Sequence, residues 1–363
     1  MNILCTNCHR PYPEQGVPYR CGACGGVFDL EGPLHFDENL VEKGQVGIWR
    51  YRNTFGLPDG APVISLGEGN TPLVWGKALG QEAAFKCEFL NPSGSFKDRG
   101  SATLVSFLQA RGVSEAMEDS SGNAGASFAA YAARGGIKAK VFLPEAASGP
   151  KRSQIAAYGA EVFPVPGPRT NAAEAVRREA KAGAIYASHA YLPFNIPGYA
   201  TLAYELVEQL GDKAFTVVIP TGQGGLLLGV KRGFEALLEA GMIQQLPKLV
   251  GVQAGACAPL WALSAYGPAG LQWVSEGQTA AEGIRVRYPV RGEAVVKAVE
   301  TTGGMFVTVG EADILAGRDE LARQGFYVEN TSAVVWKALQ AISGKVPEPI
   351  VAILTGSGLK NVA

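Results

Sequence analysis

The order of hydrophobic and polar positions predicts a chain in which strands and helices alternate. After about residue 60, short apolar runs with the length of buried strands are separated by longer stretches rich in Ala and Leu. Strands are expected at Ala83–Cys87, Ala139–Leu143, Glu161–Val165, Ala184–Ala187, Thr216–Ile219, Lys248–Val252 and Ile350–Leu354. Helices are expected at Asp98–Ala110, Ala124–Arg134, Arg152–Tyr158, Asn171–Ala182, Tyr199–Leu210 and Leu226–Ala240. This alternation favours parallel sheets covered by helices on both faces, and therefore an α/β fold.

The length of the chain indicates how the pattern divides into domains. At about 100–200 residues per domain, 363 residues are enough for two or three. We expect two parallel-sheet α/β lobes that face one another across a cleft, preceded by a small N-terminal segment. The expected boundaries are 1–32 for that segment, 33–103 with 195–363 for a large lobe, and 104–194 for a small lobe. Ligands of such sheets gather where strands end, so the turns from strand to helix are the places to look for chemistry.

Composition and charge exclude several classes of protein. Hydrophobic residues make up 47% of the chain and charged residues 18%, which is typical of a folded protein. The formal net charge of −1 argues against a basic nucleic-acid binder and against a protein held on anionic membranes. The three histidines make a metal centre built from several histidines improbable. The 47 glycines point instead to glycine-rich ligand loops.

No apolar run approaches the roughly 20 residues that a membrane-spanning helix needs. The first residues, MNILCTNC, also lack the basic and apolar regions of a secretory signal. We therefore expect a cytoplasmic protein whose thiols are reduced.

Cysteines are concentrated near the N-terminus. Four of the six form two C-x2-C pairs: Cys5, Cys8, Cys21 and Cys24. Two tight turns of this kind can present four thiolates to one tetrahedral Zn²⁺. We expect a zinc ribbon with a structural zinc over residues 1–32. The alternatives are a ribbon that has lost its metal and thiols that pair on oxidation.

The first of four unusual turns is NPSGSFKDRG, which contains Lys97. The lysine follows a loop of small residues and opens an alanine-rich helix. A helix N-terminus carries positive potential, which favours the neutral amine that Schiff-base chemistry needs. A surface lysine paired with Asp98 is the alternative reading.

The second turn is SSGNAGAS, in which Ser120, Ser121 and Gly122 precede Asn123 and a helix. Backbone N–H groups and hydroxyls at such a point form a nest suited to a carboxylate. Asn123 could instead be an ordinary N-cap, but this would not explain the residues before it.

The third turn, PTGQGGLLLG, follows an expected strand and enters a helix. Its glycines, Gly222, Gly224 and Gly225, allow backbone amides to approach a phosphate closely. Neither a Walker loop nor a G-x-G-x-x-G motif is present, and a simple tight turn is the alternative.

The fourth turn is LTGSGLK, directly after the last expected strand. Thr355 and Ser357 offer neutral hydroxyls that could bond a heterocycle nitrogen without protonating it. An ordinary polar loop is the alternative. Together the four turns supply an amine for an aldehyde, a carboxylate nest, a phosphate cradle and a partner for a ring nitrogen. Pyridoxal phosphate (PLP) carrying an amino acid requires this set.

The chain resembles the threonine synthase branch of the fold-type-II PLP enzymes. The similarity rests on GEGNTPL at Gly67–Leu73, on NPSGSFKDRG, SSGNAGAS, TGQGG and TGSGLK, and on the N-terminal ribbon found in part of that branch. It covers about 290 residues, essentially the whole chain after the ribbon. The resemblance implies two lobes about a cofactor cleft, with PLP as cofactor and a small amino acid as substrate.

The resemblance also assigns roles to residues. Lys97 would hold the cofactor covalently and then move protons. Asn123 would bond the 3′-oxygen of the cofactor, and Thr355 would face its pyridine nitrogen. Ser120, Ser121 and Gly122 would hold the substrate carboxylate. The cofactor phosphate would receive amides from Gly222, Gln223, Gly224, Gly225 and Leu226.

The sequence departs from the family in the segment SHAYLPFNIPGYAT, at residues 188–201. Threonine synthases usually carry an asparagine and an arginine here that help to bind the substrate phosphate. An ungapped alignment on Gly198 and Thr201 places Leu192 and Asn195 at those positions. Lys151, Arg152 or Arg169 could supply the missing charge. Asn195 and His189 could contact substrate, or they could only form hydrogen bonds within the loop.

Three functions are compatible with these observations. The first is a threonine synthase, a PLP-dependent carbon–oxygen lyase that converts O-phospho-L-homoserine and water to L-threonine and phosphate. The second is a related enzyme that eliminates or replaces a β-substituent, such as a threonine or serine dehydratase or a cysteine or cysteate synthase. The third is a catalytically silent amino-acid sensor, which the presence of Lys97 disfavours. The resemblance further implies a homodimer.

Overall fold

The computed structural model describes residues 2–145 and 149–361. The chain forms two compact units, each assembled from separate stretches of sequence. The first unit comprises Met1–Gly69, Asn91–Gly198 and Lys360–Ala363, and the second comprises Asn70–Leu90 and Tyr199–Leu359. The expected division at residues 32, 103 and 194 stays a prediction.

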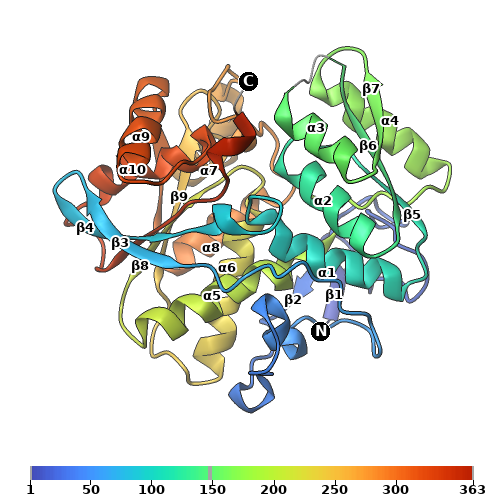
Figure 1. Cartoon of the computed structure of the whole chain (residues 1–363), viewed down its shortest axis with the longest axis horizontal. Coiled ribbons are helices and arrows are strands. Elements are labelled where there is room, and N and C mark those ends of the chain that lie inside the picture. The colour runs from blue at the N-terminus through green and yellow to red at the C-terminus, as the bar shows by residue number, and fades with distance from the viewer. Residues whose placement is uncertain (1, 146–148, 362–363) are drawn as a thin grey trace. The chain divides into compact units, whose positions relative to one another are not determined.

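The first unit contains a parallel sheet of three strands in the order β5-β6-β7 (Figure 1). The strands are β5 (Glu115–Glu118), β6 (Lys138–Pro144) and β7 (Glu161–Val165). Its helices are α1 (Lys97–Ala110), α2 (Asn123–Arg134), α3 (Pro150–Ala157) and α4 (Arg169–Lys181). The apolar side of α4, with Ala172 and Val176, packs on Met117, Phe142 and Tyr186. Helix α2 follows β5 directly, so the SSGN turn lies where a parallel strand ends.

One expected strand of this unit is absent and an unexpected one is present. Ala184–Ala187 does not form a strand but runs beside β5, with one parallel bridge between Tyr186 and Met117. Strand β5 was not expected because its four residues include two glutamates, which hide the apolar signal of Ala116 and Met117.

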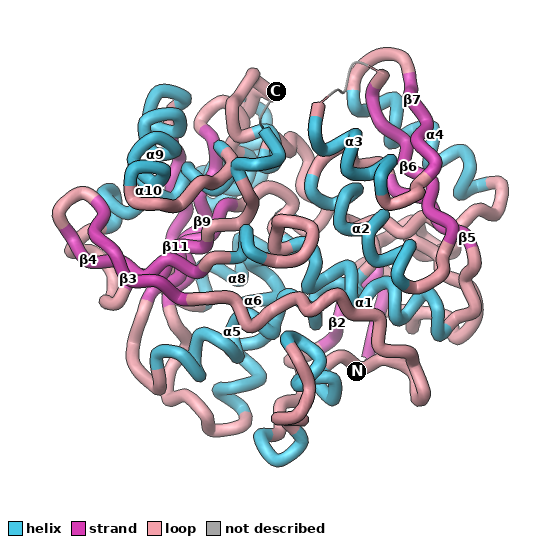
Figure 2. Tube along the Cα trace, in the orientation of Figure 1, coloured by secondary structure: helices cyan, strands magenta, loops and turns pink. Residues whose placement is uncertain are grey.

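The second unit contains a six-stranded sheet in the order β10-β9-β8-β11-β4-β3, drawn in magenta in Figure 2. All neighbours are parallel except β3 and β4, which form an antiparallel hairpin at the edge. The strands are β3 (Leu73–Ala78), β4 (Gln81–Lys86), β8 (Thr216–Pro220), β9 (Lys248–Ala254), β10 (Met305–Val309) and β11 (Ile350–Ile353). The core of this unit joins these strands to α10, which is buried along most of its length.

The second unit has several helices after residue 240, where the sequence pattern predicted none. The long helices are α5 (Ile196–Leu210), α6 (Gly225–Glu239), α7 (Pro259–Tyr266), α8 (Gly292–Thr301), α9 (Glu311–Arg323) and α10 (Asn330–Ile342). Short 3₁₀ helices lie at Glu38–Leu40, Gly47–Thr54, Glu88–Leu90, Pro193–Asn195, Gly267–Trp273, Glu282–Ile284 and Gly358–Asn361. Among the described residues, no helix combines the length and hydropathy needed to cross a bilayer.

The N-terminal segment is anchored to the first unit by aromatic contacts. Its strands β1 (Asn2–Cys5) and β2 (Phe28–Glu31) pair in antiparallel fashion. The ring of Tyr12 meets Phe28 and Phe194 edge-on, at centroid distances of 4.8 and 5.0 Å. The ribbon is therefore packed on the 3₁₀ turn that contains Phe194.

Candidate active site

Lys97 is the first residue of α1, and the turn before it is fixed by Asp98. The carboxylate of Asp98 is fully buried and accepts hydrogen bonds from Ser93 N at 2.6 Å, Ser93 Oγ at 2.5 Å and Ser127 Oγ at 2.6 Å. Burial raises the pKa of Asp98 to about 6, although the hydrogen bonds from Ser127 and Ser93 oppose the shift. The carboxylate thus ties the lysine turn to α2, which carries Ser127. The reading in which Asp98 merely neutralises a surface lysine is disfavoured by this burial.

A buried hydroxyl lies two residues before the lysine. Ser95 Oγ is enclosed and has no hydrogen-bond partner among the described residues. A buried hydroxyl without a partner costs free energy unless a ligand or water completes its bonding. The Ser95 hydroxyl near Lys97 is therefore a candidate to bond a polar ligand group.

The SSGN turn has the geometry of a nest. Helix α2 begins at Asn123 with Gly122 as its N-cap, and no side chain caps its first turn. Ser120 Oγ accepts the N–H of Gly122 at 3.2 Å. A Cβ on Gly125 would lie 1.9 Å from the carbonyl oxygen of Ser120, so only glycine permits the turn to fold back on the helix. The first backbone N–H groups of α2 are available to an anion.

Asn123 has a cationic neighbour in the same unit. Its Oδ1 accepts a hydrogen bond from Lys360 Nζ at 3.1 Å, and Lys360 belongs to the TGSGLK motif. The contact orients the amide so that its Nδ2 hydrogens point away from the ammonium group. Asn123 is thereby prepared to donate to an oxygen acceptor, as its expected role requires.

A group of titratable residues surrounds the end of β5, and of these the sequence singled out only His189. His189 Nδ1 lies 2.5 Å from Glu118 Oε1, and Tyr186 donates its hydroxyl hydrogen to Asp119 Oδ1 at 2.7 Å. Glu118 is 1% exposed and directly precedes the nest. A signal was present, because two acidic residues in succession at the end of an apolar segment are unusual in a core.

Asn195 serves the loop rather than a ligand. Its Nδ2 donates to the carbonyl oxygen of His189 at 2.7 Å, and the side chain is buried. Asn195 was expected either to contact substrate or to form hydrogen bonds within its own loop, and this hydrogen bond favours the second role. His189 itself has both a buried partner and a partly exposed ring.

The glycine turn in the second unit has the features of a phosphate cradle. Gly224 adopts a left-handed φ of +82° and caps α6 without any side-chain hydrogen bond. A Cβ there would lie 2.3 Å from Val295, and a Cβ on Gly222 would lie 3.0 Å from the Cα of Ile284. Gln223 is held by the N–H of Val290, which its Oε1 accepts at 3.0 Å. Bare backbone at the start of a long helix suits an anion.

Thr355 lies at the end of β11, where its hydroxyl is fixed by a second hydroxyl. Ser332 Oγ is 3.0 Å from Thr355 Oγ1 and also accepts the N–H of Gly356 at 2.8 Å. Both side chains are buried. The Ser332 hydroxyl that contacts Thr355 is neutral, so Thr355 suits a ring nitrogen that stays largely unprotonated. Ser332 was not expected from the sequence, since nothing about a serine within a helix marks it.

The donor set of each unit fits a different part of PLP. The first unit offers a lysine amine, the Asn123 amide and the nest, all held by buried hydrogen bonds. The second unit offers a glycine cradle, into which a Cβ would not fit, and the Thr355 hydroxyl. Lys97 and the nest are brought together within the first unit through Asp98 and Ser127. Gly222, Gln223, Gly224, Gly225 and Leu226 form one continuous turn in the second.

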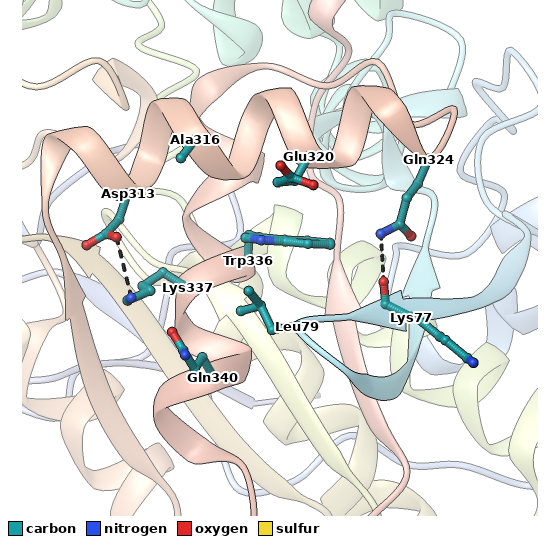
Figure 3. A pocket seen from close by; sticks show the side chains of 9 residues that line it. All are labelled: Lys77, Leu79, Asp313, Ala316, Glu320, Gln324, Trp336, Lys337 and Gln340. Carbon is teal, nitrogen blue, oxygen red and sulfur yellow. Dashed lines mark hydrogen bonds and ion pairs between the residues drawn. The ribbon is translucent and has the colours of Figure 1, made fainter.

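The second unit also has a surface pocket (Figure 3). It is bounded by the β3–β4 hairpin and by α9 and α10. An ion pair of 3.6 Å joins Lys337 to Asp313 at its edge, and Gln324 Nε2 donates to the carbonyl oxygen of Lys77 at 2.6 Å. None of the residues predicted from the sequence lines this pocket.

The four N-terminal cysteines converge on one point. Their sulfur atoms all lie within 4.8 Å of one another, with Cys5 and Cys24 at 3.4 Å and Cys8 and Cys21 at 3.6 Å. A tetrahedral Zn²⁺ with Zn–S bonds of about 2.3 Å requires sulfur separations of about 3.8 Å. The arrangement therefore fits a zinc ion.

Comparison with known proteins agrees with this reading. Residues 64–356 match the family described as pyridoxal-phosphate dependent enzyme. The chain is 34% identical to the threonine synthase of Methanocaldococcus jannaschii over 98% of its own length and 92% of that protein. It is 33% identical to the threonine synthase of Synechocystis over 86% of its length and 82% of that protein.

Among solved structures, maize serine racemase superposes with a TM-score of 0.66 at 22% identity, covering 81% of this chain and 88% of that one. This likeness concerns the fold, and it confirms the expected α/β architecture. The family match covers most of the chain, and the sequence relatives cover nearly all of it. The chain therefore belongs to the pyridoxal-phosphate-dependent enzymes, as a fold-type-II lyase of threonine synthase type.

Proposed function

We propose that this protein converts O-phospho-L-homoserine and water to L-threonine and phosphate. The observation that carries the proposal is the placement of Lys97 at the start of α1, fixed by Asp98 to the helix that follows the carboxylate nest. It is supported by the names of the relatives that match nearly the whole chain.

The roles of the first unit follow from its geometry. Ser120, Ser121 and Gly122 bind the substrate carboxylate through backbone N–H groups at the start of α2. Lys97 would hold the cofactor covalently, and its amine would take the proton from the substrate Cα. Asp98 has a positioning role: its carboxylate is fully buried and holds the lysine turn through hydrogen bonds from Ser93 and Ser127.

The second unit would bind the phosphate and the ring nitrogen of the cofactor. PLP, when bound, supplies an electron sink for the charge left on Cα. The amides of Gly222, Gln223, Gly224, Gly225 and Leu226 would hold its phosphate, and the hydroxyl of Thr355 would bond its ring nitrogen. With a hydroxyl as partner, the ring would withdraw electrons less strongly than it would with a carboxylate as partner. This favours elimination and replacement at Cβ or Cγ over transamination.

The remaining assignments concern the ribbon and the assembly. We propose that Cys5, Cys8, Cys21 and Cys24 bind one structural zinc, because their spacing in the folded chain matches a tetrahedral ion. We propose that the protein works as a cytoplasmic homodimer. The homodimer rests on the family resemblance and is tested by the mass of the protein in solution.

A second candidate function is favoured by one observation. Segment 188–201 contains no arginine, and Asn195, which stands where the family has one, is occupied with the carbonyl of His189. A dianionic phosphate is bound best by bidentate arginine. A β-eliminating or β-replacing enzyme acting on L-serine, L-threonine or O-acetylserine would not need this residue.

One panel of substrates distinguishes the candidates. The purified holoenzyme is given O-phosphohomoserine, L-threonine, L-serine and O-acetylserine in turn, while phosphate, keto acid and acetate are measured. Phosphate and threonine from the first substrate alone support the proposed function. Keto acid or acetate from the others supports the second candidate. No product from any of them, with tight binding of an amino acid, would support the silent sensor and contradict both.

A further inference from the structure

Glu118 and His189 form an enclosed ionisable pair in the first unit, and the charge of Lys97 acts on both of them. Glu118 ends β5 and is 1% exposed, while the His189 side chain is 16% exposed. Their contact, Oε1 to Nδ1, is 2.5 Å. The other carboxyl oxygen, Oε2, is buried without a hydrogen-bond partner in the described parts of the chain. An ionised carboxylate with such an oxygen is costly, so the buried group favours its neutral form.

Burial determines how many protons this pair holds. Burial raises the pKa of Glu118 to about 8, although its backbone hydrogen bond to His189 and the charges of Lys97 and Arg169 oppose the shift. Burial, together with the positive charge of Lys97, lowers the pKa of His189 well below its usual range. At neutral pH the pair therefore shares one proton between Oε1 and Nδ1. The imidazole must then carry its own hydrogen on Nε2.

The groups that act on the pair include two cations, which favour the binding of an anion nearby. Nε2 lies on the side of the ring away from Glu118, and the ring is partly exposed. The charged and titratable groups that act on the pair are Lys97 of α1, Arg169 of α4, and Asp119, which is bonded to Tyr186 beside β5. Asn195 fixes the backbone of His189 through its carbonyl oxygen. His189 is thus held by Glu118 at its ring and by Asn195 at its backbone.

We propose that His189 donates its Nε2 hydrogen to the substrate's phosphate group and that Glu118 is the positioning residue that keeps this hydrogen on Nε2. The proposal rests on the proposed function for the identity of the substrate. It explains how a chain without an arginine in segment 188–201 can bind a phosphomonoester in its first unit.

The direct test uses inorganic phosphate, the product of the proposed reaction, as the probe. Its dissociation constant is measured by calorimetry on the holoenzyme and on His189→Ala, His189→Gln and His35→Asn. Loss of a hydrogen bond to a charged group should weaken binding by about 10- to 100-fold in His189→Ala. Glutamine places an amide donor near the position of Nε2, so His189→Gln should stay within about threefold. His35 is exposed and remote in sequence from the site residues, so His35→Asn should bind as the parent does.

The pH dependence separates a positioning role for Glu118 from a merely structural one. When pH rises through about 8, the pair loses its proton, and the remaining imidazole hydrogen moves to Nδ1 to donate to the carboxylate. Nε2 then presents a lone pair, so phosphate binding should weaken between about pH 7.5 and 9. Over this range inorganic phosphate only becomes more negative, so its own titration does not account for a loss of affinity for a hydrogen-bond donor. Glu118→Gln removes the titrating group and His189→Gln removes the imidazole. Both variants should therefore lose this fall in affinity.

Two outcomes would overturn the inference. One is a folded, cofactor-loaded His189→Ala variant that binds phosphate as tightly as the parent. The other is an unchanged pH dependence in Glu118→Gln. Failure of the proposed function looks different, because the parent would then release no phosphate from O-phosphohomoserine. With an active parent, His189→Ala should raise KM for that substrate about tenfold or more while kcat changes by less than about threefold.

Discussion

Lys97 and Asp98 are adjacent residues with different roles, one chemical and one structural. The lysine provides the amine, and the buried carboxylate next to it fixes the turn through three hydrogen bonds. The sequence identified the lysine because its surroundings of small residues are unusual. It could not identify the role of the aspartate, since the partners of Asp98 include Ser127, which lies 29 positions away and is brought near only by the packing of α1 on α2.

The first prediction concerns Lys97. Lys97→Ala removes the amine that holds the cofactor and moves the Cα proton, so turnover should fall by at least about a thousandfold. The visible absorption of the covalently held cofactor should disappear as well. Lys181→Ala, a change at the exposed end of α4, is the matched control and should leave both signals intact. Appreciable activity in Lys97→Ala would remove the central assignment.

The second prediction concerns Asp98 and pH. Its pKa is raised from 3.8 to about 6 by burial, so the folded state binds its proton more tightly than the unfolded chain does. The contribution of this group to the free energy of unfolding should therefore be full below about pH 4 and decrease as pH rises to 6. The difference corresponds to about 3 kcal/mol.

Urea unfolding at pH 4, 5, 6 and 7 tests whether the contribution of Asp98 to the free energy of unfolding decreases as pH rises. Asp98→Asn keeps a hydrogen-bonding side chain of the same shape but cannot ionise, so its stability relative to the parent should improve as pH rises. Ser114→Ala, next to β5 and not bonded to Asp98, serves as the control. A parent that gains stability relative to Asp98→Asn between pH 4 and 6 would show that the hydrogen bonds outweigh burial.

At the scale of elements, the ribbon supports the segment that carries His189. Tyr19 packs edge-on against Tyr186 and Tyr191, at centroid distances of 5.1 and 5.4 Å. The guanidinium of Arg20 lies 4.7 Å from the ring centre of Tyr191. Both residues directly precede Cys21, so the turn that would bind zinc also sets these contacts. The proposed zinc site is thus connected to the segment that carries His189 through packed tyrosine rings, although the two are far apart in sequence.

The third prediction follows from this connection. Replacing Cys8 and Cys24 together with serine should abolish zinc binding, lower the free energy of unfolding and increase hydrogen exchange over residues 186–195. Zinc content by metal analysis should fall from about one per chain to none. Thr6→Ser, which retains a hydroxyl in the same turn, should change neither. If exchange over 186–195 stays the same after zinc is lost, the ribbon does not support the segment.

Predictability from sequence also varies by element. Strands β8, β9 and β11 were expected because they are buried on both faces and read as continuous apolar runs. Strand β3 was not expected because it forms the exposed edge of its sheet, where apolar and polar residues mix. Helix α10 is buried on almost every side, which removes the apolar stripe by which a helix is recognised.

The same reasoning applies to the site. Glycine turns and the lysine loop are local, and a few consecutive residues define them. Ser332, Glu118 and Lys360 act through partners far away in sequence, at separations of 23, 71 and 237 residues. No periodicity or spacing indicates such pairs, because tertiary packing alone brings them together.

At the scale of the whole molecule, the path of the chain limits how the second unit can form. This unit takes β3 and β4 from Asn70–Leu90 and the rest of its sheet from Tyr199–Leu359. Strand β4 pairs with β11, and Lys86 at its end makes a buried ion pair of 2.7 Å with Glu205. Residues 199–359 alone would expose the β11 edge and leave the Glu205 carboxylate buried without its cation.

The last prediction is that residues 199–359, expressed alone, do not fold cooperatively. An unpaired buried charge costs several kcal/mol, which is a large share of the stability of a typical domain. A fusion in which residues 70–90 precede 199–359 through a flexible linker restores both β4 and Lys86. This fusion should therefore show a single cooperative unfolding transition by circular dichroism, and its Lys86→Met variant should be markedly less stable. Cooperative unfolding of 199–359 on its own would mean that the hairpin is an addition to a self-sufficient sheet, and that the second unit can form before the first is complete.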